Sequence, residues 1–365
     1  MIPGASWSVA EATRGQSPSD LIAGDFAGDV ILLWIRSETT NIVTSRKGLK
    51  IQKWSASATP LWSGTGGPGT PIDIYTSNQT PNRQIGSGYF PAALPDGSGG
   101  AVVSWYDTGA TLNAWVQHVS GTGVQRFAQD GLAVSTTPAA TERRLSSAAI
   151  YLASTDEYVV AFERSNPAQS LFGLGAQRIS GTGSLQWGGS GEGIEILPLA
   201  TGNHKSFVNA QAAPGGTAIV AWLEYQGANG PMIVQATRLD GSGAAMWSPA
   251  LLDVASTSST KGRLTSTVVT GSDMLVLAWQ DGAAGSADIK AQNLFPTGDL
   301  GEVACPGDVN GDGAVNLSDL SLLLAAFGTS SGDAGYNAGA DFNDSGTIDL
   351  SDLSVLLANF GTTCP

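Results

Sequence analysis

Short apolar runs recur along most of the chain, and each run ends in an aromatic residue that is soon followed by an acid. Four copies read "GGAVVSWYD", "DEYVVAFER", "GTAIVAWLE" and "SDMLVLAWQD". Their aromatic residues, Trp105, Phe162, Trp222 and Trp279, are 57, 60 and 57 positions apart. An earlier, more divergent copy is "GDVILLWIR", which contains Trp34. A near-constant period of about sixty residues predicts five structural repeats.

A second strand-like segment and a Gly-rich turn follow each run, as in "GLGAQRISGTG" and "IVQATRLDGSG". A further aromatic residue then comes at the same offset in four repeats: Trp62, Phe127, Trp187 and Trp247. Four short strands joined by turns are typical of one blade of a β-propeller. A twisted four-stranded sheet buries both faces only against its neighbours, so we expect the large aromatic residues to fill the space between blades.

The fifth repeat ends after "NLFPTGDLGEV", before its second aromatic residue and its last strand. The N-terminal segment "ASWSVAEATR" contains Trp7, which is similar in context to Trp187 and Trp247. We expect this segment to supply the missing strand, because closure removes the free edges of the ring. The expected fold is mostly β, a five-bladed β-propeller over residues 1–304, closed by the N-terminal strand and followed by a small α-helical domain over residues 305–365. A row of β-sandwiches is the alternative, because a period alone does not establish closure.

The pattern changes near the C-terminus, where "GDVNGDGAVNLSDLSLLLAAFG" (307–328) returns as "ADFNDSGTIDLSDLSVLLANFG" (340–361), shifted by 33 positions. Leucine and phenylalanine then recur at helical spacing in both copies. The two apolar stripes are Leu320, Leu323, Leu324 and Phe327, and Leu353, Leu356, Leu357 and Phe360. We expect two helices that pack on each other through these stripes and end at Gly328 and Gly361.

Oxygen-bearing residues alternate along the segment before each predicted helix. Counted from Asp308, they occupy positions 1, 3, 5, 9 and 12, with a backbone carbonyl at 7 and Gly313 at 6. This is the EF-hand loop pattern with Asp in the last position, and it suits Ca²⁺, which takes 6–8 oxygen ligands. The expected ligands are Asp308, Asn310, Asp312, Ala314, Asn316 and Asp319 in the first loop, and Asp341, Asn343, Ser345, Thr347, Asp349 and Asp352 in the second. Two calcium ions are therefore expected, with three carboxylates around each.

Charge is concentrated in the same tail. Residues 305–365 contain eight Asp and no Lys, Arg or Glu, which accounts for −8 of the total net charge of −14. Bound cations would relieve the repulsion between these carboxylates. The overall negative charge argues against nucleic acid as a partner. No apolar run approaches the ~20 residues of a membrane span.

Cys305 and Cys364 are the only cysteines, and they flank the acidic tail. A pair of cysteines that closes one small domain is expected to form a disulfide in a secreted protein, whereas both would be thiols in a reducing compartment. The first ten residues, "MIPGASWSVA", lack the basic and apolar segments of a signal peptide. Removal of a leader and a cytosolic location are both compatible with this, and the rest of the composition favours secretion.

With its duplicated loops and helices, the tail over residues 306–361 resembles a type I dockerin, the calcium-dependent module that docks onto cohesin domains. The resemblance implies that loop positions 10 and 11, with the following helix face, contact the cohesin. These positions are Leu317 and Ser318 in the first copy and Leu350 and Ser351 in the second. Because "NLSDLSLLLAAFG" and "DLSDLSVLLANFG" are nearly the same, the resemblance implies docking in either of two orientations. The tail departs from familiar members in having no basic residue in its helices, which leaves the identity of the partner open.

The repeats resemble a type found in secreted bacterial proteins, which implies an extracellular location but no defined activity. The acids at the ends of the apolar runs, Asp107, Glu163, Glu224 and Asp281, invite comparison with glycoside hydrolases, which need two carboxylates. Because these acids repeat with the period, a structural role is favoured, and the same holds for Gln117, Gln177 and Gln292. Acids outside the pattern are Asp25, Asp29, Asp73, Glu142, Glu195 and Asp253.

Three function classes follow from these observations. The first is a non-catalytic secreted propeller that binds a glycan or a protein and is recruited by its dockerin to a cohesin-like protein. Trp54 and Trp115, if exposed, are candidates for stacking on sugars in this case, although burial between blades is the simpler interpretation. The second is a carbohydrate-active enzyme on a five-bladed propeller. The third is a structural protein whose tail contacts another copy of the chain. The first class is preferred, and no catalytic residue is assigned.

Overall fold

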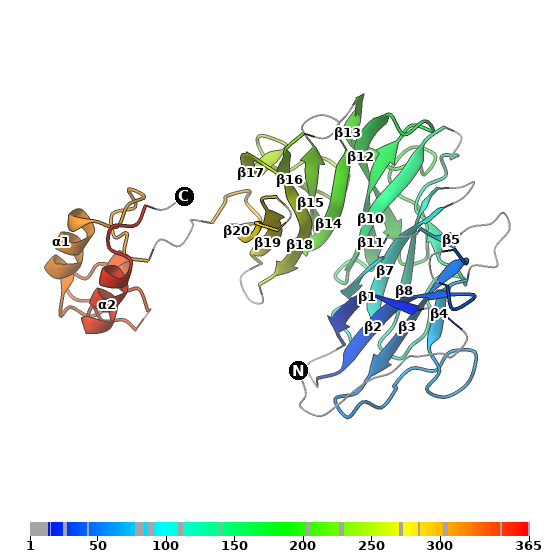
Figure 1. Cartoon of the computed structure of the whole chain (residues 1–365), viewed down its shortest axis with the longest axis horizontal. Coiled ribbons are helices and arrows are strands. Elements are labelled where there is room, and N and C mark those ends of the chain that lie inside the picture. Colours follow the sequence, from blue (N-terminus) through cyan, green and yellow to red (C-terminus); the bar gives the residue numbers. More distant parts are fainter. Residues whose placement is uncertain are drawn as a thin grey trace. The chain divides into compact units, whose positions relative to one another are not determined.

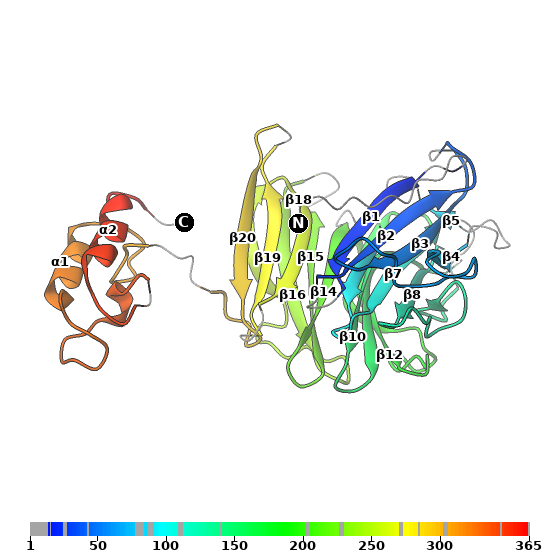
Figure 2. The same cartoon turned by 90° about the horizontal axis from the view of Figure 1, so that it is seen from below.

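The computed structural model divides into two compact units, residues 1–300 and 301–365. It is mostly β, and the two α-helices of its described part lie near the C-terminus (Figures 1 and 2). The residues that the structure describes are 14, 16–24, 28–41, 44–76, 84–86, 89, 91–108, 112–138, 141–201, 204–225, 230–269, 273–283, 285–301, 306–343 and 345–363. Within these ranges, neither helix is long and apolar enough to cross a bilayer.

The first unit contains antiparallel sheets that follow one another in chain order. The first sheet has the order β1 (Gln16–Ala23), β2 (Val30–Ser37), β3 (Lys47–Trp54) and β4 (Ile72–Tyr75). In the second sheet, β7 (Ala101–Thr108) pairs with β8 (Ala114–Val119), which pairs with β9 (Leu132–Ala133). The other side of β7 pairs with two short strands, β5 (Gln84–Ile85) and β6 (Ala92–Pro95).

The third and fourth sheets repeat the simple four-stranded order. The third consists of β10 (Arg143–Leu152), β11 (Glu157–Ser165), β12 (Leu171–Ser180) and β13 (Ile194–Thr201). The fourth consists of β14 (Lys205–Ala213), β15 (Thr217–Tyr225), β16 (Met232–Leu239) and β17 (Leu252–Ser259). The last sheet has three strands in the described residues: β18 (Lys261–Val268), β19 (Leu275–Asp281) and β20 (Asp288–Leu294).

The hydrophobic core of this unit lies between consecutive sheets. Side chains alternate along each central strand, so one strand contributes to the core on both of its faces. On β15, for example, Val220 and Trp222 pack with the third sheet, whereas Ala221 and Leu223 pack with the fifth. The aromatic residues at the ends of the apolar runs, Trp105, Phe162, Trp222 and Trp279, all lie in such clusters. This arrangement confirms the predicted role of these aromatic residues as packing between repeats.

The second set of aromatic residues joins each sheet to the turn of the next. The indole Nε1 of Trp62 donates to the carbonyl of Gly121 at 3.0 Å, and that of Trp187 donates to Gly241 at 3.0 Å. Trp247 does the same with Pro296 at 2.9 Å. The burial of the rings and the satisfied indole N–H groups stabilise the contact between neighbouring repeats.

The repeated glutamines hold these aromatic residues in place. The Gln177 amide donates to the Trp187 carbonyl at 3.1 Å and accepts the Trp187 backbone N–H at 2.8 Å. Gln117 makes the same pair of contacts with Phe127, at 3.2 Å and 2.9 Å. Both glutamines are fully buried, and their expected structural role is confirmed by these contacts.

Trp7 and its neighbours, the segment expected to close the ring, lie outside the described residues. Trp34 nevertheless gives information on the open side of the first sheet. Trp34 lies between Leu33 and Ile35 on β2, so its side chain points to the opposite face of the sheet from theirs. Leu33 and Ile35 pack against the second sheet, and yet only 1% of the surface of Trp34 is exposed. The face of the first sheet that points away from the second sheet is therefore also covered at Trp34.

The second unit contains α1 (Leu317–Ala326), a 3₁₀ turn (Ala338–Ala340) and α2 (Leu350–Ala358). α1 ends at Ala326 and α2 at Ala358, and the glycines predicted to stop them, Gly328 and Gly361, follow within three residues with positive φ of +83° and +85°. The predicted apolar stripes are only half right. Leu323 and Leu356 are fully buried.

The other half of each stripe faces solvent: Leu324, Phe327, Leu357 and Phe360 are between 40% and 55% exposed. The stripe prediction was wrong for these four residues because the core takes its remaining side chains from outside the helices. Val315 and Ile348, from the loops before α1 and α2, are both fully buried in this core. Ala340 of the 3₁₀ turn is also fully buried there, and Val309, Tyr336 and Phe342 pack against the same core, so part of each helix face is left exposed.

The two halves of this unit exchange backbone pairs. The segment after α2 bonds to the first loop, with Val315 N–H donating to Thr362 and Gly361 N–H to Val315. The segment after α1 bonds to the second loop in the same way, through Ile348 with Gly328 and Thr329. Isolated bridges between Ala314 and Thr363 and between Ser330 and Thr347 extend both contacts. These backbone hydrogen bonds hold the two loops against one compact core.

Candidate metal centre

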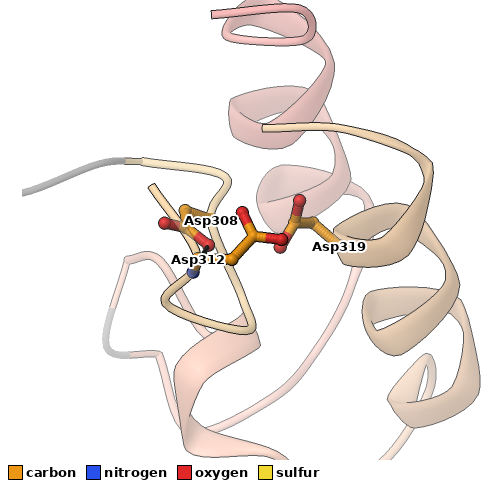
Figure 3. Close-up of side chains that lie close together, drawn as sticks. All are labelled: Asp308, Asp312 and Asp319. Carbon is orange, nitrogen blue, oxygen red and sulfur yellow. Dashed lines mark hydrogen bonds between the residues drawn. The ribbon is translucent and has the colours of Figure 1, made fainter. Parts of the chain in front are cut away.

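The first loop brings three carboxylates together ahead of α1. Oxygen atoms of Asp308, Asp312 and Asp319 all lie within 4.8 Å of one another, with Asp308 and Asp312 on the loop and Asp319 on the helix (Figure 3). Asp308 is held by backbone N–H groups of the same loop, from Gly311 and Gly313, each at 2.8 Å. Gly313 has φ = +83°, the conformation expected for the sixth loop position. These backbone hydrogen bonds fix the direction of the Asp308 carboxylate toward the other two.

Asp319 links the loop to the helix. Its side chain is fully buried and accepts backbone N–H groups from Val309 at 2.9 Å and from Asn316 at 2.9 Å. Burial raises the pKa of this carboxyl, but the backbone hydrogen bonds outweigh burial and the net pKa is lowered. Asp319 is thus ionised at neutral pH, as a calcium ligand must be.

The other predicted ligands of the first loop serve local structure. Asn310 donates to Asp312 at 2.9 Å and accepts its backbone N–H at 2.8 Å. Asn316 caps α1 by accepting the Ser318 N–H at 2.7 Å, and its amide donates to the Ala314 carbonyl at 3.2 Å. The carboxamide and carbonyl groups of these residues offer oxygen atoms, which are the ligands that calcium takes.

The second loop has the same backbone frame. Asp341 accepts the N–H groups of Ser345 at 3.0 Å and Gly346 at 2.8 Å, as Asp308 does with the corresponding residues. Asp352 is fully buried and accepts N–H groups from Phe342 and Asp349, each at 2.9 Å. Asn343 accepts the Ser345 N–H at 3.0 Å.

Two details of the second loop differ from the first. The Ser345 hydroxyl, at the position of the Asp312 carboxylate, donates to the Thr347 carbonyl at 3.1 Å. Asp349 caps α2 through the Ser351 N–H at 2.7 Å, just as Asn316 caps α1. Tyr336, which sequence reasoning missed, donates its hydroxyl to Asp341 at 2.7 Å. This bond, together with the N–H groups of Gly346 and Ser345, lowers the pKa of Asp341. No spacing rule in the sequence connects Tyr336 with the loop.

The residues expected to contact a partner lie on the surface. Leu317 and Leu350 begin the two helices and are each 72% exposed. Ser318 and Ser351, which follow them, are exposed as well. Leu324 on α1 and Phe327 directly after the helix extend the first apolar row, and Leu357 on α2 and Phe360, two residues after the helix, extend the second. We call these rows the first ridge (Leu317, Leu324, Phe327) and the second ridge (Leu350, Leu357, Phe360).

Cys305 and Cys364 lie outside the described residues, so their pairing stays a prediction. In the sheets, the acids at the ends of the apolar runs serve the fold. Glu163 accepts the backbone N–H of Lys205 on the neighbouring sheet at 3.1 Å. Glu224 pairs with the buried Lys205 at 3.2 Å, and Asp281 pairs with the buried Lys261 at 3.5 Å.

The described acids outside the repeat pattern are also engaged. Their partners are Lys53 for Asp29, Lys50 for Asp73, Arg164 for Glu142 and Glu195, and Gln235 for Asp253. Asp25 lies outside the described residues. Trp54 is buried, so it is not exposed for sugar stacking, and Trp115 is partly buried against the core, which favours the alternative of packing between repeats. Both tryptophans contribute to packing within the sheet unit.

Comparison with known proteins identifies the C-terminal unit. Residues 306–360 match the family model of the dockerin type I domain. A search among curated proteins gave no match.

Solved structures similar to the chain include a protein of unknown function from Dyadobacter fermentans (10% identity, 73% of this chain and 76% of that chain, TM-score 0.47). They also include an endo-arabinase from Bacteroides thetaiotaomicron (10% identity, 78% of this chain and 95% of that chain, TM-score 0.42). An ulvan lyase of family PL25 is similar at 10% identity, over 76% of this chain and 67% of that chain, with a TM-score of 0.43. Likenesses of this size establish neither a common fold nor a common activity.

Proposed function

We propose that this chain is a secreted protein whose dockerin binds two calcium ions and docks onto a cohesin-type partner. The observation that carries the proposal is the match of residues 306–360 to the dockerin type I model. The oxygen-only loops support calcium as the ion, because zinc would need Cys or His. Asp308, Asp312 and Asp319 would hold the first ion, and Asp341 and Asp352 would hold the second. The ions neutralise charge and link each loop to its helix.

The two ridges are the surface that the partner covers. Each ridge places a leucine that is 72% exposed at the start of its helix, and a second leucine and a phenylalanine beyond it. Exposed apolar rows of this kind mark sites of protein interaction. Because residues 301–365 carry no Lys or Arg, the matching face of the partner is expected to be apolar rather than acidic.

The sheet unit is proposed to be a five-bladed propeller that binds a glycan or a protein. Five consecutive sheets with shared cores support a propeller. Ion pairs and hydrogen bonds at its described acids support a binding role over catalysis. Incubation of the full chain with plant and algal polysaccharides tests this: retention without release of sugars supports binding, and release of sugars would show an enzyme instead.

Docking is tested by measuring the affinity of the full chain for immobilised cohesin modules, with calcium and with chelator. Leu317→Asp and Leu350→Asp each remove one ridge and are expected to weaken binding about two-fold, because the other orientation remains. The double variant is expected to abolish binding, since a carboxylate would be buried without a partner in either orientation.

Val124→Asp is the matched control, because Val124 is 63% exposed on the sheet unit. It is expected to leave docking unchanged. Equal binding by the double variant and the wild type would contradict docking through the ridges. Binding of the chain to another copy of itself, without binding to a cohesin, would show that the partner is another copy of the protein.

A further inference from the structure

We infer that the two calcium loops are unequal and that the first loop fills at a lower calcium concentration than the second. The inference rests on the proposed calcium-binding function and adds an order of loading to it. It follows from a comparison of equivalent residues, which are 33 positions apart in the two loops.

The backbone frames of the two loops are the same. The N–H of the sixth residue donates to the first aspartate at 2.8 Å in both loops, from Gly313 to Asp308 and from Gly346 to Asp341. The last aspartates, Asp319 and Asp352, are both fully buried. A difference in affinity must therefore come from the side chains that complete each site.

The fifth position differs in chemistry. Asp312 in the first loop brings a carboxylate within 4.8 Å of Asp308 and Asp319. Ser345 in the second loop offers only a neutral hydroxyl, whose oxygen lies 3.1 Å from the Thr347 carbonyl and 3.2 Å from the Thr347 hydroxyl. Calcium affinity depends on the number of charged ligands. The second loop has lost one of them at this position.

The extra carboxylate of the second loop does not replace Asp312. Asp349 stands at the ninth position, where the first loop has Asn316, and both side chains cap their helices. The cap bonds are equivalent: Ser318 N–H to Asn316 at 2.7 Å and Ser351 N–H to Asp349 at 2.7 Å. Among the described residues, three carboxylates come within 4.8 Å of one another in the first loop and not in the second. Asp344, at the fourth position, lies outside that description.

Tyr336 adds a further difference. Its hydroxyl donates at 2.7 Å to Oδ2 of Asp341, the same oxygen that accepts the Gly346 N–H at 2.8 Å. A cation at the second loop must share this oxygen with two donors. In the first loop, Oδ2 of Asp308 accepts the equivalent N–H from Gly313, and the described residues give it no second donor corresponding to Tyr336. The second loop therefore binds calcium less tightly than the first. The calcium concentration then determines whether one loop or both loops hold an ion.

Isothermal titration of the calcium-free full chain tests the inference. The wild type is expected to bind two ions in two steps whose dissociation constants differ at least tenfold. Ser345→Asp is expected to tighten the weaker step at least tenfold and leave the stronger step unchanged. Asp312→Ser is the reciprocal variant and is expected to weaken the stronger step. The double variant, Asp312→Ser with Ser345→Asp, is expected to show two unequal steps again, with the stronger step now at the second loop and the weaker step at the first.

Two equivalent sites in the wild type, or no change of either step in Ser345→Asp, would overturn the inference while leaving calcium binding intact. No calcium binding at all would overturn the proposed function as well, and the titration distinguishes these results. Because Ser345→Asp is a gain in affinity, loss of folding cannot produce the expected result. Tyr336→Phe is expected to tighten only the weaker step, and tightening of the stronger step would contradict the role of Tyr336.

Discussion

A buried chain of polar side chains joins the second and third sheets at Asp96, His118 and Tyr158. His118 lies between the other two, with Nε2 at 2.9 Å from the Asp96 carboxylate and Nδ1 at 2.6 Å from the Tyr158 hydroxyl. Asp96 also accepts the N–H groups of Ser98 and Gly100 in its turn. Burial alone would raise the pKa of Asp96, but hydrogen bonds from His118, Ser98 and Gly100 lower it to about 2.

This shift predicts an acid-sensitive contribution to stability. The pKa of Asp96 is lower in the folded than in the unfolded chain, so its contribution is present above about pH 4 and is lost as the pH falls towards 2. The loss is roughly 2 kcal/mol. Asp96→Asn is expected to lower the free energy of unfolding at neutral pH by a similar amount and to flatten its decrease between pH 4 and 2.

Urea unfolding followed by tryptophan fluorescence, repeated across this pH range, measures the effect. Asp288→Asn is the control, because Asp288 is exposed on β20. It is expected to keep the slope of the wild type. If Asp96→Asn kept that slope too, the hydrogen bonds of Asp96 would not be a source of acid sensitivity.

At the scale of the elements, contacts between repeats depend on glycines in the turns. Gly243 has φ = +88°, and a Cβ at this position would lie 2.7 Å from Ile194 and 3.3 Å from Trp187. Gly215 has a similar φ of +76°, but a Cβ there would meet nothing within 4 Å. A comparison of substitutions at these two glycines therefore distinguishes the cost of backbone strain from the cost of disturbed packing.

Gly215→Ala is expected to cost about 1 kcal/mol through its left-handed backbone alone. Gly243→Ala is expected to cost about 1–3 kcal/mol more, because the added methyl displaces side chains of the neighbouring sheet. Chemical unfolding of both variants measures the difference. Equal losses would show that the turn does not pack tightly against the preceding sheet.

The elements also show what the sequence allowed and where it failed. The period of the aromatic residues predicted the repeats, and the loop pattern predicted the metal-binding frame, because both depend on residues at fixed spacing. The exposure of Leu324 and Phe327 was missed, since helical spacing identifies an apolar face but not how much of it a small core can cover. Tyr336 was missed because its contact with Asp341 depends on how the segment between the helices folds back.

At the scale of the whole molecule, the last sheet has three strands in the described residues, whereas the third and fourth sheets have four. We propose that the segment around Trp7 provides its fourth strand and the aromatic residue that this repeat lacks. Trp7→Ala is then expected to destabilise the sheet unit by about 3–5 kcal/mol, the cost of removing a buried tryptophan. Trp187→Ala, at the equivalent position inside the chain, is the matched comparison. A loss below about 0.5 kcal/mol for Trp7→Ala, as for an ordinary surface change, would contradict closure by this segment.

The central claim is that calcium orders the C-terminal unit and thereby presents its two ridges to a partner. Hydrogen exchange of the full chain, measured with chelator, with calcium and with calcium plus a bound cohesin, tests it most directly. Calcium is expected to slow exchange across residues 308–327 and 341–360 and to leave the sheets unchanged. The cohesin is expected to add protection at the starts of α1 and α2. Exchange in these two segments that is equally slow with chelator and with calcium would contradict it.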